Sequence, residues 1–366
     1  MRRPNAGFSL IELMVAVMLG LILMVALISV FVGSRSAYQE TSGVASLADE
    51  GRFAVNTISP LARGAGFIGC SRASTAATGS SLLNWSSAPV AYDFRYPVGG
   101  YEAAATAPGD TLTIPATPTA GAGAGNWTPT LDAAVTGATS QQVKGSDVIV
   151  LRSSLPGAKP VYTTADVAGG AGSLTVSGTG TLQAGQLAVI SNCMMAVPFQ
   201  ISSVAAGTPA TVHFDGTTGA PGNAATALPV GFSAGALVYP LTTTIFYIGV
   251  GADGDSALRR LDLQNGQVGP AIFTDAEVVE DVENMQVLYG VDTASGTEYV
   301  TADQVPDFDS VVSLEIAVLV ASAPGATAAP ATAPTFDLLG TTVTAPKDTR
   351  LRRVFEKTIG LRDALH

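Results

Sequence analysis

Glu12 has the most unusual chemical setting in this chain. It is the only charged residue in an apolar run from Phe8 to Val32, and a short leader from Met1 to Gly7, carrying Arg2 and Arg3, precedes that run. An ionised carboxylate costs about 2.5–3.5 kcal/mol at the centre of a bilayer and less near its edge. Because a partner of opposite charge would offset this cost, the pattern indicates an acid with a function of its own.

Two carboxylate pairs are the residues that could hold a metal ion. Asp253 with Asp255 and Asp292 with Glu298 lie in short polar segments, and oxygen ligands in a loop suit Ca²⁺. Neither pair has the spacing of a complete calcium-binding loop. We interpret all four as solvated turn residues that are weak calcium candidates, and we expect no cofactor and no metal.

The remaining reactive side chains give no sign of catalysis. The sequence has two histidines, His213 in the segment TVHF and the terminal His366, and it contains none of the common zinc-protease, hydrolase or phosphate-loop patterns. We interpret His213 as a strand or surface residue. The expectation is therefore an assembly component and not an enzyme.

Cys70 and Cys193 are the two cysteines of the sequence. In an exported protein an even number of cysteines suggests a disulfide, here one bridge that closes a long loop. The alternative is two unpaired, buried thiols that behave as small hydrophobic groups. The residues by themselves leave both interpretations open.

The composition restricts the class of protein. Hydrophobic residues make up 47% of the 366 residues and charged residues only 13%, against roughly 25% charged in an ordinary soluble domain. This balance favours an exported, β-rich protein with long loops. The net charge of −11 argues against nucleic acid as a direct partner, because phosphate backbones need a basic surface.

The apolar run must be positioned by a helix. No proline occurs between Pro4 and Pro60, and the helical pattern continues beyond the run, which predicts one helix from about Phe8 to the low sixties. A cleaved signal peptide would have a shorter apolar core and a small-residue cleavage site. A transmembrane anchor needs about 20 apolar residues, which Leu13 to Val32 supply, but an anchor leaves Glu12 unexplained.

The rest of the chain is predicted to be mainly strands and loops. Region 71–146 is rich in Ala, Gly, Ser and Thr and reads as loops with a few short strands, whereas the acidic stretch 275–284 reads as a short helix with a solvated face. The fold class is α+β: a long N-terminal α-helix packed on an antiparallel β-sheet, with large loop insertions. The predicted strands are 147–152, 186–190, 197–204, 237–250, 258–263, 285–291, 310–320 and 350–361.

The string GFSLIELMVAVMLG at residues 7–20 resembles the class III signal of type IV prepilins and type II secretion pseudopilins. In that family a membrane peptidase cleaves after the glycine, here Gly7, and N-methylates the new first residue, here Phe8. The family's glutamate at position five of the mature chain corresponds to Glu12. The resemblance implies that Glu12 pairs with the new amine of another subunit and sets the register between subunits.

This resemblance also implies a division of the chain into a leader (1–7), a membrane or filament-core half of the helix (8–33), a periplasmic half (34–64) and a β-rich globular pilin domain (65–366). The basic leader would stay on the cytoplasmic side. The expected location is the bacterial inner membrane, crossed once with the globular domain in the periplasm, and then the pilus at the cell surface.

Six later segments resemble the minor pilin family called PilW, in the family's order. The family usually has tryptophan where Phe308 stands and arginine near Glu315, so this chain departs from the pattern there. A cysteine pair at the places of Cys70 and Cys193 is common in the family, and the resemblance thus implies a disulfide. The segments are 63–70, 146–154, 190–201, 279–292, 308–320 and 348–365.

What the PilW resemblance implies is a minor pilin that primes type IV pilus assembly, at the pilus tip. Its partners would be other minor pilins, the major pilin, the prepilin peptidase, the assembly platform of the inner membrane and the membrane itself. One alternative is a minor pseudopilin of type II secretion. Another is a tip adhesin or ligand-binding module, suggested by the Gly-, Ala- and Thr-rich stretches 71–146 and 205–235.

Overall fold

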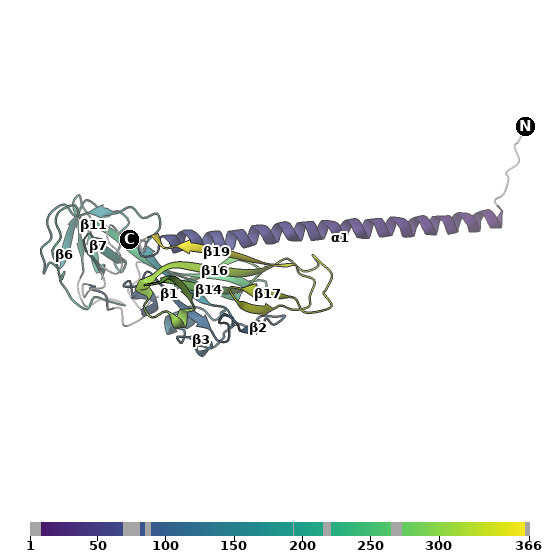
Figure 1. The fold of residues 1–366 in the computed structure, drawn as a ribbon. Coiled ribbons are helices and arrows are strands. Elements are labelled where there is room, and N and C mark those ends of the chain that lie inside the picture. The colour runs from purple at the N-terminus through teal and green to yellow at the C-terminus, as the bar shows by residue number, and fades with distance from the viewer. Residues whose placement is uncertain are drawn as a thin grey trace, which may run out of the picture.

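One long helix, α1 (Leu10–Arg63), projects from a β-rich body (Figure 1). The computed structural model describes residues 9–68, 81–84, 89–192, 194–214, 221–264 and 273–362. With 54 residues at 1.5 Å per residue, α1 is about 80 Å long. The continuous helix predicted from the sequence is confirmed from Leu10 onward.

Local chemistry explains where α1 begins and ends. Ser9 is the N-cap, and Glu12 stands at the third helical position, where its carboxylate accepts the Ser9 backbone N–H (3.1 Å). At the other end Gly64 donates its N–H to the Pro60 carbonyl (3.1 Å). Gly66, with a φ of 84°, then turns the chain back onto the body.

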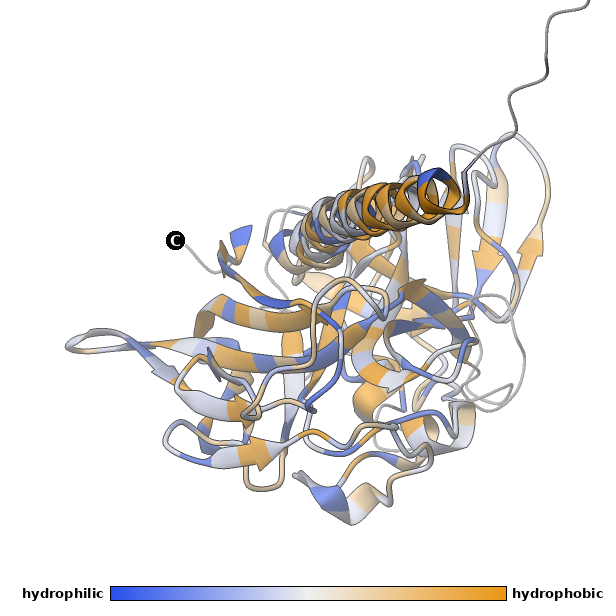
Figure 2. Ribbon diagram, turned by 90° about the vertical axis from the view of Figure 1, so that its right-hand side faces the viewer, coloured by the Kyte–Doolittle hydropathy of each residue, from blue (hydrophilic) through white to orange (hydrophobic). Residues whose placement is uncertain are grey.

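The C-terminal half of α1 lies on a four-stranded antiparallel sheet with the order β15-β14-β16-β19. Figure 2 views the molecule from the N-terminal end of α1 and shows the helix over one face of the body. We call these four strands the helix-bearing sheet. They are β14 (Val282–Thr293), β15 (Gly296–Val300), β16 (Val311–Ala321) and β19 (Arg352–Gly360).

A second sheet completes the body beneath the helix-bearing sheet. Its main path is β13-β12-β11-β4-β1-β3. The long strand β11 pairs with β4 and β12 along its second half and with β5 and β7 along its first four residues. The strands are β1 (Val98–Ala103), β3 (Trp127–Thr128), β4 (Val148–Ser154), β11 (Leu237–Val250), β12 (Ser256–Leu263) and β13 (Phe273–Val279).

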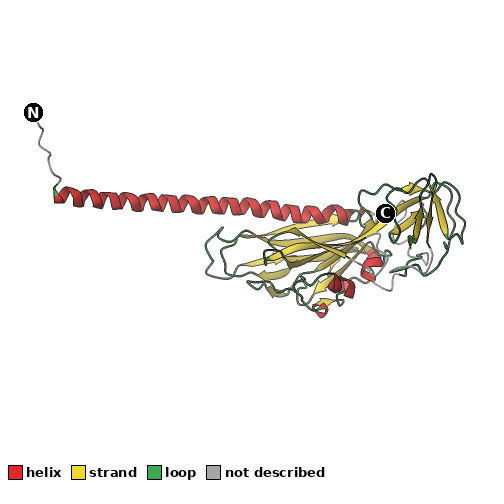
Figure 3. Ribbon diagram, turned by 180° about the vertical axis from the view of Figure 1, so that it is seen from behind, coloured by secondary structure: helices red, strands yellow, loops and turns green. Residues whose placement is uncertain are grey.

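Residues 155–240 form a separate group of strands, which we call the distal lobe. It has a buried apolar core of its own that includes Ile190, Phe199 and Phe214, and its strands lie past the C-terminal end of α1 (Figures 1 and 3). The glycine-rich stretch 205–235 thus contributes to a folded lobe. The strands are β5 (Val161–Tyr162), β6 (Ser173–Val176), β7 (Leu187–Ser191), β8 (Ala196–Gln200), β9 (Ser203–Ala205) and β10 (Ala210–His213).

A small third sheet, β17-β18-β2, covers the helix-bearing sheet on the side away from α1. Its β18–β2 pair is parallel. Short helices fill the remaining connections. These elements are β2 (Thr111–Thr113), β17 (Thr335–Leu338), β18 (Thr341–Thr344), α3 (Pro89–Tyr92), α4 (Ala133–Ala138), η2 (Ala124–Asn126), η3 (Ala302–Gln304) and η4 (Phe308–Ser310).

The short helix predicted for 275–284 is wrong. This stretch is the end of β13, a tight turn with Asp281 at a φ of 57°, and the start of β14. Asp275 and Glu277 are two residues apart, so in a strand their side chains share a face. Arg259 of β12 lies opposite that face and pairs with both carboxylates (3.1 and 3.3 Å), which favours the strand.

Candidate assembly surface on the N-terminal helix

Glu12 lies in the first turn of α1, on the part of the helix that stands clear of the body. Its carboxylate accepts the Ser9 N–H (3.1 Å), and a negative charge in the first turn complements the helix dipole. The adjacent side chains of Ile11 and Leu13 are 72% and 60% exposed. Glu12 is thus an anion within an uncovered apolar surface.

That apolar surface continues along the first half of α1. Every large apolar side chain from Leu10 to Val32 is between 52% and 74% exposed, and residues 9–42 have no buried position. By length and composition this helix could cross a membrane. An uncovered surface of this extent marks a site for lipid or for other proteins, so we take 10–32 as the candidate assembly surface.

The second half of α1 is fixed to the helix-bearing sheet. Leu47, Ala54, Ile58 and Ala62 are buried there, and their spacing of seven, four and four residues makes one stripe. The Asn56 side chain accepts a hydrogen bond from Lys357 of β19 (3.1 Å). The body therefore sets the direction in which the assembly surface projects.

Two glycines allow this close packing. A Cβ on Gly51 would lie 2.1 Å from the Phe355 ring of β19, and a Cβ on Gly43 would lie 2.7 Å from the Cβ of Ala326. A side chain at either position would push the helix away from the sheet. Gly43 and Gly51 are two turns apart on the same face, so together they define the line of contact.

Four predicted site residues lie outside the described residues. These are the expected cleavage and methylation positions Gly7 and Phe8, and the two cysteines, Cys70 and Cys193. The processing site and the disulfide remain predictions.

The two carboxylate pairs that were candidates for calcium binding have different surroundings in the structure. Asp253 and Asp255 have carboxylate oxygens within 4.8 Å of each other and of Asp281, and the Arg350 guanidinium bonds Asp255 and Asp281. The positively charged side chain of Arg350 thus already pairs with two of these three carboxylates.

The second calcium pair is not brought together. In the β14–β15 ladder Asp292 is opposite Thr297, and Glu298 is opposite Val291. Neighbouring positions along a strand point to opposite faces, so the two carboxylates face away from each other.

Arginine–carboxylate pairing holds β19 in place, which the sequence reasoning missed. Arg352, whose side chain is 2% exposed, bonds Glu283 of β14 (2.7 Å) and Asp348 (2.6 Å). The expected solvated face of 275–284 is therefore an ion-paired one. The signal was present: Arg350 and Arg352 are two residues apart at the start of the last predicted strand, and acids stand at positions 275, 277, 281 and 283.

Glu102 and Asp147 form a second acidic group, which no pattern in the sequence indicates. Asp147 accepts the backbone N–H groups of Ala103 in β1 (2.9 Å) and Val287 in β14 (2.8 Å), and so links the two sheets. One Glu102 oxygen contacts Thr106 (3.3 Å), and the other has no hydrogen-bond partner among the described residues. Burial raises the pKa of Glu102 to about 7 and also raises the pKa of Asp147.

Two family models match this sequence. The prokaryotic N-terminal methylation motif matches residues 2–28, and Type IV Pilus-assembly protein W matches residues 245–363. No match was found among curated proteins. Among solved structures, a type IV-like pilin from Thermus thermophilus is similar at 18% identity, over 34% of this chain and 70% of that chain, with a TM-score of 0.21.

The methylation motif, which lies across the apolar half of α1, and the antiparallel sheet under its other half define a type IV pilin-like protein. Within that class, residues 245–363 are similar to Type IV Pilus-assembly protein W. The matched PilW region begins in β11 and includes the whole helix-bearing sheet, whereas the distal lobe lies outside it. Phe308, at a usual tryptophan position, keeps an aromatic contact with Tyr289 (ring centroids 5.4 Å apart).

This membership carries general consequences. A pilin with a prepilin motif is a structural protein that interacts with the prepilin peptidase and with pilus components. The motif and the apolar helix fit anchoring in a membrane and association with a pilus.

Proposed function

We propose that this protein is a minor pilin that primes type IV pilus assembly together with other minor pilins and stays at the pilus tip. The observation that carries the proposal is the uncovered apolar half of α1 with Glu12 in its first turn. Such a surface is stable only in lipid or against the helices of other subunits. Transfer from one environment to the other is the step that assembly requires.

Processing at Gly7–Phe8 supplies the cation that Glu12 needs. The new amine of one subunit and the Glu12 carboxylate of the next meet in an environment of low dielectric constant. Such a pair contributes more to the choice of register than to stability. Before assembly, Arg2 and Arg3 hold the N-terminus on the cytoplasmic side, and the body folds in the periplasm.

The position of the distal lobe supports a place at the tip. Its strands lie past the C-terminal end of α1, at the end of the molecule opposite the assembly surface (Figure 1). If the helices of successive subunits lie along the filament axis, the lobe occupies space that a subunit stacked above would need. A subunit of this shape fits best where nothing follows it.

Replacement of Glu12 tests the proposal. We expect Glu12→Ala to be cleaved normally but to enter sheared pili at least tenfold less than the wild type, because a charge-assisted pair contributes about 1.5–3 kcal/mol. The matched control is Glu40→Ala, an exposed acid on α1 beyond the apolar run. Immunoblots of sheared pili measure incorporation, and mass spectrometry identifies the N-terminus.

Gold labelling of an epitope in the distal lobe locates the subunit in the same preparations. Label at filament ends supports the tip, whereas label along the filament contradicts it. A retained leader in place of N-methyl-Phe8 would overturn the processing step. Equal incorporation of Glu12→Ala and Glu40→Ala would overturn the role of Glu12.

A further inference from the structure

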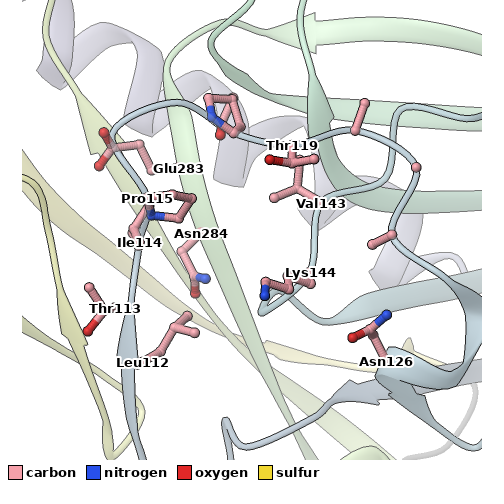
Figure 4. A pocket seen from close by; sticks show the side chains of 15 residues that line it. Leu112, Thr113, Ile114, Pro115, Thr119, Asn126, Val143, Lys144, Glu283 and Asn284 are labelled. Atoms are coloured by element: carbon pink, nitrogen blue, oxygen red, sulfur yellow. The ribbon is translucent and has the colours of Figure 1, made fainter.

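A cavity of about 360 Å³ lies in the body, away from the assembly surface. It is bounded by β2, by the segment 114–126, by Val143 and Lys144 ahead of β4, and by the start of β14 (Figure 4). Its volume is at the lower end of the roughly 300–1,000 Å³ of small-molecule sites. The segment 114–126 contains the TAGAGAG tract that the sequence left without a role.

The walls of the cavity are apolar and held by backbone bonds. Ile114 donates its N–H to Thr344 of β18 (2.9 Å), and Ala122 donates to Gln142 (3.0 Å), so the segment is tied at both ends. A wall fixed in this way loses little freedom when a ligand enters. The apolar lining comes from Leu112, Ile114, Pro115, Pro118, Ala122 and Val143.

Two polar side chains of the lining, Glu283 and Asn284, are already engaged. Both carboxylate oxygens of Glu283 accept from Arg352 (2.7 and 2.8 Å). The Asn284 amide donates to Gly145 (2.6 Å) and accepts from Gln286 (2.8 Å). Both side chains are therefore held by hydrogen bonds within the protein.

Lys144 is different. Its side chain belongs to the ring of lining residues in Figure 4, and within the described part of the chain no carboxylate pairs with it. The cavity therefore offers apolar walls and one solvent-exposed cation that pairs with no carboxylate among the described residues. Charge complementarity calls for a ligand with an apolar portion and a single anionic group.

We propose that this cavity binds a small organic carboxylate with an apolar portion, whose carboxylate pairs with Lys144. The ligand is a free molecule that enters between segment 114–126 and β14, and its apolar portion contacts Leu112, Pro118 and Val143. This site is independent of the pilus role proposed above, because none of its residues belongs to α1.

The test uses the full-length protein in lipid nanodiscs and 3-phenylpropionate as the probe. An amine-acylating reagent modifies lysines, and peptide mass spectrometry follows each of the four lysines in the sequence separately. We expect the probe to slow acylation of Lys144 in a saturable way and to leave Lys159, an exposed lysine before the distal-lobe strands, unchanged. The neutral analogue 3-phenylpropionamide should protect Lys144 at least tenfold less effectively.

Calorimetric titration of variants supplies a second readout. Lys144→Met keeps an apolar side chain without charge and should weaken 3-phenylpropionate binding at least tenfold, whereas Lys144→Arg and Lys159→Met should bind like the wild type. Equal protection of Lys144 and Lys159 would overturn the proposal. So would equal potency of the acid and the amide, or unchanged binding by Lys144→Met.

Discussion

Carboxylates gather in two regions of the body, and their surroundings are opposite. At the β19 end, Arg350 and Arg352 pair with four acids: Asp255, Asp281, Glu283 and Asp348. Between the two large sheets, Glu102 and Asp147 are buried with no cation in contact within the described residues. They have backbone and hydroxyl donors instead.

The difference shows how this fold deals with charge at two kinds of junction. Where β19 joins the sheet under α1, each acid has an arginine, and the hydrogen bond from Arg352 lowers the pKa of Asp348. Where the two sheets meet, burial raises the pKa of Glu102 to about 7, and burial together with the charge of Glu102 raises the pKa of Asp147. At the β19 end burial also raises the pKa of Asp281, but there the hydrogen bond and charge of Arg350 oppose the rise. Arginine is thus the group that distinguishes the two regions.

Loss of Arg352 should have the largest effect. Arg352→Met leaves Glu283, 12% exposed, without its cation, and breaking a buried pair costs about 3–5 kcal/mol. Arg353→Met is the matched control, because Arg353 is exposed and its guanidinium lies over the Phe355 ring (5.4 Å), a contact contributing about 0.5–1 kcal/mol. Chemical denaturation of both variants measures the difference. Similar losses would mean that the arginine network adds nothing specific.

Removing the Glu102 charge should have the second-largest effect on the free energy of unfolding, and it should stabilise the protein. Its pKa is raised from 4.5 to about 7, so the folded state holds a proton that the unfolded state releases. The stability that depends on Glu102 is therefore fully present below pH 4.5 and is lost as the pH rises through 7. Glu102→Gln removes this loss and should stabilise the protein by about 1–3 kcal/mol at pH 8, with little effect at pH 4.5.

The charges facing Glu102 make this prediction specific. Besides burial, the charges of Asp303 and Asp110 raise its pKa, whereas hydrogen bonds from Thr106 and from the Ala302 backbone lower it. Glu298→Gln is the control, an exposed glutamate on β15, and it should change stability at neither pH. Thermal unfolding of the wild type, Glu102→Gln and Glu298→Gln at pH 4.5 and at pH 8 measures these differences in stability. A Glu102→Gln variant less stable than the wild type at pH 8 would show that the carboxylate is ionised and well accommodated.

The sequence predicted the regular elements of the fold well, and physical periodicity explains why. The apolar repeat gave α1, and runs of β-branched residues gave β11 and β16. The composition of the acidic stretch before β14 suggested a helix, but this stretch contains a strand, in which Asp275 and Glu277 pair with Arg259 of the neighbouring strand. In the distal lobe the strands predicted at 186–190 and 197–204 correspond to β7 and β8. The shorter strands β5, β6 and β10 had no predicted counterpart, because Gly-, Ala- and Thr-rich segments carry little pattern.

A candidate site could be predicted only where its residues are also neighbours in the sequence. Glu12 could be found because its neighbours in sequence are its neighbours in space. Glu102 and Asp147 come from β1 and from the start of β4, and Val287 of β14 completes their setting. Lys144 is isolated in sequence, and only the fold places it beside Leu112 and Asn284.

The smallest effect is expected at Asp348, and its pH dependence separates the two regions most clearly. The side chain of Asp348 is 34% exposed, so Asp348→Asn should cost about 0.3–1 kcal/mol at pH 7. Because the pKa of Asp348 is lowered in the folded state, the stability it contributes is present above pH 3.8 and lost as pH falls further. At low pH, Asp348→Asn should therefore be as stable as the wild type. In contrast, the stability of Glu102→Gln should differ from that of the wild type only at higher pH. A loss at Asp348 as large as that of Arg352→Met would place the main partner of Arg352 at Asp348 and not at Glu283.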